Sequence, residues 1–105
     1  MTAVTAVRGK RVAVFGLARS GLAAISLLDR EGAQIVAVDA RTREQLGPEV
    51  VGFLEPGIQL SLGGDPTEVL SRADLVVVSP GVPLGHPALR AAAQAGVEII
   101  GEIEL

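Results

Sequence analysis

The chain has 105 residues, a formal net charge of −3, 49% hydrophobic residues and only 2% aromatic residues, which suits one domain with a core of Val, Leu, Ile and Ala. It has no cysteine and a single histidine, which excludes disulfides and leaves no basis for a metal site, and its dispersed basic residues argue against a nucleic-acid-binding surface. No apolar run reaches the roughly 18 to 20 residues that span a bilayer, so we expect a cytoplasmic monomer that does not insert into a membrane.

The expected elements start after residues 1–9, which are small, polar and unpatterned and are predicted to form a flexible leader. From there, apolar runs of strand length alternate with segments of helical pattern. The expected strands cover residues 12–15, 35–38, 58–62, 75–78 and 97–100. The expected helices run to about residue 31 after the first strand, over 48–55, over 67–72, and from 87 to about 95, with Gly32 and Gly96 just past two of the ends.

This alternation predicts an α/β domain over residues 10–105. Because crossovers between parallel strands are right-handed, we expect a Rossmann-like five-stranded parallel sheet with strand order 3-2-1-4-5 and helices on both faces. The carboxyl ends of all strands then meet at one edge, where such folds bind ligands. The residues expected at this edge are 16–20, 39–41, 63–64, 79–81 and Gly101.

The turn after the first strand reads Gly-Leu-Ala-Arg-Ser-Gly from Gly16 to Gly21. It resembles a dinucleotide-binding turn, but Ala18 stands where that pattern has the glycine that lets the backbone approach a pyrophosphate, which counts against a dinucleotide. The N–H groups of the following helix can still bind a phosphate, with the Ser20 hydroxyl and the Arg19 charge beside them. The turn therefore predicts an anion site, the alternative being glycines that only make a tight turn.

Asp39 and Arg41 follow the second strand. The Asp39 carboxylate could accept hydrogen bonds from a ribose diol or a base N–H, and the Arg41 guanidinium could stack on a ring, unless the two only form a surface ion pair. The Gly-Gly pair at Gly63 is most simply a turn. The loop over residues 79–83 contains two prolines, so we expect it to be a stiff wall and not a catalyst.

Two further features limit the chemistry of this chain. His86 precedes Pro87 at a helix start, where capping or packing is the expected role, and we assign it no catalysis. Lys10 is the sole lysine, and no Gly-x-x-x-x-Gly-Lys-Ser/Thr motif is present, so the chain cannot hold ATP in a P-loop by itself.

Four stretches together, at residues 9–21, 73–83, 86–87 and 101–105, resemble the N-terminal domain of the Mur ligase family. The resemblance implies a three-domain enzyme of peptidoglycan synthesis, a process that maintains cell shape and cell division. In it an ATP-dependent ligase joins D-glutamate to UDP-N-acetylmuramoyl-L-alanine. This first domain would hold the uridine diphosphate moiety, with no catalytic residue, metal or cofactor of its own, and would be inactive alone. ATP, Mg²⁺ and D-glutamate would bind to a central and a C-terminal domain outside this chain.

The resemblance also implies a set of site residues. It assigns the diphosphate to Arg19 and Ser20, the uracil to residues 39–41 with a backbone contact at Ala40, and a lining role to Gly63. The expected substrate-binding residues are Gly16, Ala18, Arg19, Ser20, Asp39, Ala40, Arg41, Gly63, Ser79, Pro80 and Gly81. Two other interpretations stay open, the NAD-binding domain of a dehydrogenase and a stand-alone module that senses a nucleotide.

Overall fold

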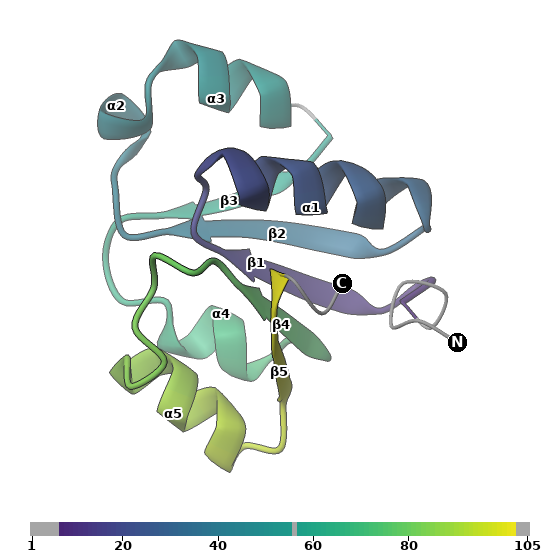
Figure 1. Cartoon of the computed structure of the whole chain (residues 1–105), viewed down its shortest axis with the longest axis vertical. Helices are drawn as coiled ribbons and strands as arrows, with labels where there is room; N and C mark the ends of the chain where they lie inside the picture. Colours follow the sequence, from purple (N-terminus) through teal and green to yellow (C-terminus); the bar gives the residue numbers. More distant parts are fainter. Residues whose placement is uncertain (1–6, 56, 103–105) are drawn as a thin grey trace.

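The computed structural model describes residues 7–55 and 57–102, which fold into a five-stranded sheet between two layers of helices (Figure 1). All neighbouring strands are parallel, and their order is β3-β2-β1-β4-β5. The strands are β1 (Arg11–Phe15), β2 (Gln34–Asp39), β3 (Gln59–Leu62), β4 (Leu75–Val78) and β5 (Glu98–Gly101). The predicted α/β Rossmann-like fold and its strand order are confirmed.

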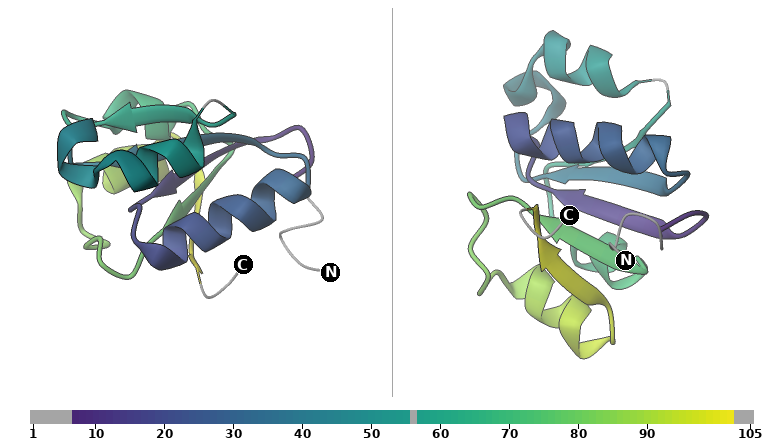
Figure 2. Two further views of the ribbon diagram at one scale, coloured as in Figure 1. Left: turned by 90° about the horizontal axis from the view of Figure 1, so that it is seen from above. Right: turned by 45° about the vertical axis from the view of Figure 1, so that its right-hand side comes forward.

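The helices are α1 (Arg19–Arg30), α2 (Arg43–Leu46), α3 (Pro48–Leu54), α4 (Thr67–Ser71) and α5 (Pro87–Gln94). The first three cover one face of the sheet, and α4 and α5 cover the other, as the two views of Figure 2 also show. The four predicted helices are confirmed. Within the described residues, none of the helices has the length and apolar character needed to cross a membrane.

Helix α2 was not predicted, although the sequence carries its signal. The hydroxyl of Thr42 accepts a hydrogen bond from the Gln45 N–H, and the Gln45 side chain accepts one from the Thr42 N–H. This reciprocal pair is a capping box, whose sequence pattern is Thr-x-x-Gln. The box matters for the site because it starts a helix directly after Arg41 and so ends the segment that follows β2.

Each face of the sheet carries its own hydrophobic core. Alternate residues of a strand point to opposite faces, so Val12 and Val14 pack toward α1 and α3, whereas Ala13 and Phe15 pack toward α4 and α5. Both faces of β1 are therefore covered from Val12 onward. This explains why the strands read as unbroken apolar runs and not as alternating ones.

The folded domain begins earlier than the predicted leader allows. Residues 1–6 lie outside the described residues, as do residues 103–105 at the other end. Val7, however, is only 2% exposed and packs in the core beneath α1. Its carbonyl accepts a hydrogen bond from the Lys10 N–H, and the Gly9 N–H donates to the Gly32 carbonyl. Residues 7–9 thus belong to the domain and not to the predicted leader. No periodic pattern could predict this, because a single apolar residue, Val7, makes the contact.

Candidate functional site

A cavity of about 340 Å³ lies at the carboxyl edge of the sheet. Its walls come from the turn after β1, the segment after β2 and the loop after β4. The chain leaves β1 for α1 on one face of the sheet and leaves β4 for α5 on the other face. The two connections diverge there and leave a crevice between neighbouring strands, which is where open α/β sheets bind ligands.

Two glycines bring the first turn of α1 close to the end of β1. Gly16 has a φ of +105°, and a Cβ at this position would lie 2.5 Å from the Cβ of Ser79. A Cβ at Gly21 would lie 2.1 Å from the carbonyl oxygen of Gly16. Neither position has room for a side chain, so both glycines are needed for the approach of helix to strand.

The N-terminus of α1 faces this turn without a side-chain cap. Ala18 is the N-cap residue, has extended backbone (φ −84°, ψ −175°), and its side chain makes no capping hydrogen bond. The first N–H groups of a helix have no acceptor within the helix, so an uncapped N-terminus is suited to an anion. Ser20 lies inside the first turn and does not cap the helix.

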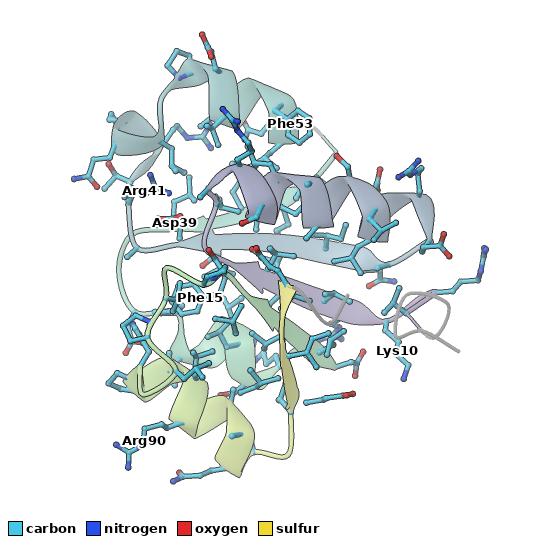
Figure 3. The ribbon with its side chains drawn as sticks, viewed as in Figure 1. Lys10, Phe15, Asp39, Arg41, Phe53 and Arg90 are labelled. Atoms are coloured by element: carbon cyan, nitrogen blue, oxygen red, sulfur yellow. The ribbon has the colours of Figure 1, made fainter. Side chains whose placement is uncertain are left out.

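The carboxylate of Asp39 is fully engaged within the protein. Its Oδ2 accepts hydrogen bonds from the Leu17 N–H at 2.8 Å and from Nη2 of Arg41 at 2.9 Å. Its Oδ1 accepts from the backbone N–H of Arg41 at 2.8 Å and from Nε of Arg41 at 3.0 Å. These four donors fill the acceptor capacity of a carboxylate, and Asp39 is only 6% exposed. The free acceptor expected from the sequence is thus not free: Asp39 instead ties the turn after β1 to the segment after β2 (Figure 3).

The electrostatics of Asp39 and Arg41 follow from this arrangement. Burial raises the pKa of Asp39, but the hydrogen bonds from Arg41 and Leu17 and the positive charge of Arg41 outweigh burial, so that the pKa lies below its ordinary value. The hydrogen bond with Asp39 is the main cause that raises the pKa of Arg41. The Arg41 side chain is nevertheless 50% exposed at the cavity, so its guanidinium plane is held in position and still accessible to a ring that stacks on it.

The loop after β4 closes the cavity on the side away from Arg41. Ser79 is buried, its N–H donates to the Phe15 carbonyl at 2.9 Å, and its carbonyl accepts from the Val82 N–H at 3.0 Å. The Ser79 hydroxyl also accepts a longer hydrogen bond of 3.4 Å from the Gly81 N–H. The loop is therefore anchored to β1, as a wall requires.

The structure brings most of the predicted site residues together. Those that line the cavity are Gly16, Ala18, Asp39, Ala40, Arg41, Ser79 and Gly81. Arg19, Ser20, Gly63 and Pro80 are not among its lining residues. Gly63 has a supporting position instead, since its N–H donates to the carbonyls of Asp39 and Arg41. Which of these residues contact a ligand stays a prediction.

The expected substrate-binding residues omit five of the lining residues, Phe15, Leu17, Val82, Pro83 and His86. Leu17 nevertheless lies in the segment 16–20 that was expected at this edge, and Val82 and Pro83 lie in the loop that was expected to be a wall. Phe15 is the last residue of β1, so its place next to Gly16 was the available signal. The fifth, His86, is the N-cap of α5 as predicted, and its Nδ1 accepts a hydrogen bond from the Ala88 N–H at 3.1 Å. Its additional place at the cavity had no signal in the sequence.

Among the described residues, neither a metal-binding group of side chains nor a lysine lies at the cavity. Over residues 7–55 and 57–102, no three His, Asp or Glu side chains gather in a group that could hold a metal ion. Lys10, the sole lysine, immediately precedes β1 and lies at the opposite edge of the sheet from Asp39 and Arg41 (Figure 3).

Known proteins resemble this chain in both sequence and fold. It is 47% identical over 100 residues to the UDP-N-acetylmuramoylalanine–D-glutamate ligase of Myxococcus xanthus and 46% identical over 98 residues to that of Acidobacterium capsulatum. These alignments cover 95% and 93% of this chain but 22% and 21% of the relatives, so the chain spans about a fifth of their length.

Solved structures share the architecture. A shikimate dehydrogenase from Aquifex aeolicus matches with a TM-score of 0.62 at 16% identity, over 93% of this chain and 44% of that chain. A scyllo-inositol dehydrogenase from Lactobacillus casei matches with a TM-score of 0.60 at 16% identity, over 96% of this chain and 29% of that chain. At such identities the likeness concerns the fold alone. The family model described as "Mur ligase MurD-like, N-terminal domain" matches residues 10–101, and the chain therefore belongs to the Mur ligase family as a MurD-like N-terminal domain.

Proposed function

We propose that this chain is the substrate-binding domain of an ATP-dependent ligase that joins D-glutamate to UDP-N-acetylmuramoyl-L-alanine in peptidoglycan synthesis. The names of its relatives support the reaction, and the family match supports the place of the domain in the enzyme. In this proposal the domain works in the cytoplasm as part of a monomeric enzyme. ATP, Mg²⁺ and D-glutamate bind to domains outside this chain.

The observation that carries the proposal is an uncapped helix N-terminus and a fixed guanidinium on the walls of one cavity. The N-terminus of α1 suits the charge of a diphosphate, and the Arg41 guanidinium suits the face of a planar base. In this proposal a uridine diphosphate lies along the carboxyl edge, between the N-terminus of α1 and Arg41, and the loop over residues 79–83, three of whose residues other than Ser79 line the cavity, forms the wall.

The same geometry argues against an NAD-binding domain. In dinucleotide folds an acidic residue at the end of the second strand accepts hydrogen bonds from a ribose hydroxyl. Here all four acceptor positions of Asp39 are taken by Leu17 and Arg41. A ribose diol would have to displace the guanidinium, and the Ala18 methyl group further hinders the close approach of a pyrophosphate backbone.

The contribution of this domain to catalysis is then positional. No residue of the chain takes part in forming the amide bond. Binding the nucleotide part of a substrate firmly supplies orientation and binding energy to a reaction at a distant carboxylate. The domain by itself should therefore bind the nucleotide but release no phosphate from ATP.

The test is a titration of the ¹⁵N-labelled domain with UDP and with NADH, followed by NMR. We expect a Kd for UDP of about 0.1 to 1 mM, because the domain alone makes only part of the contacts of the whole enzyme, whereas binding still costs the translational and rotational freedom of the ligand. The amide signals of residues 16–21 and 40–41 should shift. Tighter binding of NADH, with shifts at the same turn, would overturn the uridine assignment.

A matched pair of arginine variants tests the position of the base. Arg41→Ala removes stacking on the ligand and should weaken UDP binding by roughly 0.5 to 2 kcal/mol. Arg43 is equally exposed but pairs with Glu55 at 2.8 Å, outside the cavity. Arg43→Ala should therefore leave the affinity for UDP unchanged. Equal effects of the two substitutions would remove the support for a base beside Arg41.

A further inference from the structure

A second cavity of about 310 Å³ adjoins the first. The two share Phe15, Ala40 and His86, and the second continues past them to the turn at residues 64–67 and the start of α5. The three shared residues therefore form the boundary between the two spaces. The edge of a planar ligand that reaches deepest into the first cavity would contact these three residues.

The imidazole of His86 is held rigidly at this boundary. Its Nδ1 accepts a hydrogen bond from the Ala88 N–H at 3.1 Å, and its ring packs edge to face on Phe15, with ring centres 5.2 Å apart and planes at 81°. A neutral imidazole whose Nδ1 accepts carries its proton on Nε2. Within the described part of the chain, no hydrogen bond accepts this Nε2–H, although the carboxylate of Asp65, which lines the second cavity, interacts electrostatically with the imidazole. His86 thus presents a hydrogen-bond donor at the boundary between the two cavities.

The nucleotide proposed above is oriented by its charge. With its diphosphate at the N-terminus of α1, its base would lie beyond the ribose, near Ala40 and Arg41, and the edge of the base distal to the ribose would face the boundary that the two cavities share. In uracil this distal edge carries the carbonyl oxygen at position 4, an acceptor. In cytosine the same position carries an amino group, a donor.

We infer that His86 selects the base, because its Nε2–H donates a hydrogen bond to the 4-carbonyl oxygen of uracil. The inference rests on the proposed function and adds a specificity residue to it. Cytosine would place its amino group against the imidazole N–H, leaving two donors face to face in a half-buried site. The unpaired donor should give a preference for UDP over CDP of about tenfold, which corresponds to about 1.4 kcal/mol.

The experiment measures the affinities of UDP and CDP for the wild-type domain and for His86→Asn. Asparagine is a good N-cap residue, so α5 keeps its start, but the shorter side chain lacks the Nε2–H. We expect wild type to prefer UDP about tenfold and His86→Asn to bind both nucleotides within about threefold of each other. Inorganic pyrophosphate, which has no base, should bind both proteins equally.

Each other outcome is decisive. Equal affinities of UDP and CDP for wild type, or an unchanged preference in His86→Asn, would overturn the role of His86 and leave the UDP site intact. Failure of both nucleotides to shift the signals of residues 16–21 would overturn the proposed function itself. Should His86→Asn not fold, the wild-type protein decides alone: the ¹⁵N resonance of the His86 Nε2 should move further on saturation with UDP than on saturation with CDP, and equal shifts or no shift with UDP would refute the inference.

Discussion

Replacing Asp39 with Asn should destabilise the domain through a backbone N–H group and not through the ion pair. The wild-type carboxylate accepts from the N–H groups of Leu17 and Arg41, each at 2.8 Å, one on each oxygen. A carboxamide of the same shape has one oxygen and one NH₂ group. Whichever way it turns, one of the two backbone N–H groups loses its acceptor and faces another donor.

The expected loss in the free energy of unfolding depends on how far each hydrogen-bond partner of Asp39 is exposed to solvent. A hydrogen bond to a charged acceptor contributes about 1.5 to 3 kcal/mol, and an unsatisfied buried donor costs about 1 to 3 kcal/mol. The side-chain part of the pair counts for less, about 0 to 1 kcal/mol, because the Arg41 side chain is 50% exposed and solvent screens it. Asp39→Asn should therefore lower the free energy of unfolding by about 2 kcal/mol or more, and Arg41→Ala by about 1 kcal/mol or less.

Urea unfolding of wild type and both variants, followed by circular dichroism, measures these differences. The decisive comparison is between the two variants. If Asp39→Asn unfolds within about 0.5 kcal/mol of wild type, the range of ordinary surface substitutions, or if Arg41→Ala costs as much as Asp39→Asn, the role assigned to the backbone N–H groups of Leu17 and Arg41 is wrong.

The pH dependence gives a second signature. The pKa of Asp39 in the folded state lies below its ordinary value of 3.8, so the stability that the carboxylate contributes is fully present above pH 3.8 and is lost as the pH falls through the folded-state pKa. The gap in stability between wild type and Asp39→Asn should stay constant from neutral pH down to about pH 5 and narrow below about pH 4. A gap that persists unchanged into strong acid would contradict the assignment.

Three further predictions concern packing, charge and binding. Gly21→Ala places a Cβ 2.1 Å from the Gly16 carbonyl oxygen, so it should lower the free energy of unfolding by about 1 to 3 kcal/mol and weaken UDP binding. Gly52→Ala has no atom within 4 Å of its new Cβ and should stabilise α3 by about 0.5 to 1 kcal/mol. Urea unfolding that ranks the two variants in the reverse order would refute this prediction. Both carboxylate oxygens of Glu102 are buried without a hydrogen-bond partner among the described residues, so Glu102→Gln should raise the free energy of unfolding by about 1 kcal/mol, and a loss of stability would speak against an unpaired charge. Ser20→Ala should weaken UDP binding by about 1.5 to 3 kcal/mol but change stability by no more than about 0.5 kcal/mol, because Ser20 does not cap α1; unchanged UDP affinity would remove the hydroxyl from the site.

Local features of the sequence were enough to predict most of the fold. Apolar runs of strand length marked all five strands, and Pro87 and Gly96 bounded α5. Once strands and helices alternate, the right-handed crossover leaves few possible arrangements of a parallel sheet, which is why the strand order 3-2-1-4-5 could be predicted without a structure. The same rule placed Gly16, Asp39 and Ser79 at one edge, since Asp39 ends β2 and the other two directly follow β1 and β4. Thr42 and Gln45 show that α2 was also within reach, because a capping box acts over three residues.

Only the tertiary structure decided what the side chains at that edge do. Three of the four hydrogen bonds to Asp39 come from Arg41, a pair that the sequence left open, whereas the fourth comes from Leu17, which lies 22 positions earlier and reaches Asp39 only when β1 and β2 pair. Val7 joined the core, and His86 joined the cavity, through contacts that likewise have no local signal. Periodicity and turn chemistry act over a few neighbouring residues, whereas the occupancy of a carboxylate or the wall of a cavity depends on which distant segments meet. The sequence by itself therefore determined the scaffold and the edge where the site lies, and the packing of the strands decided which atoms at that edge are free to bind.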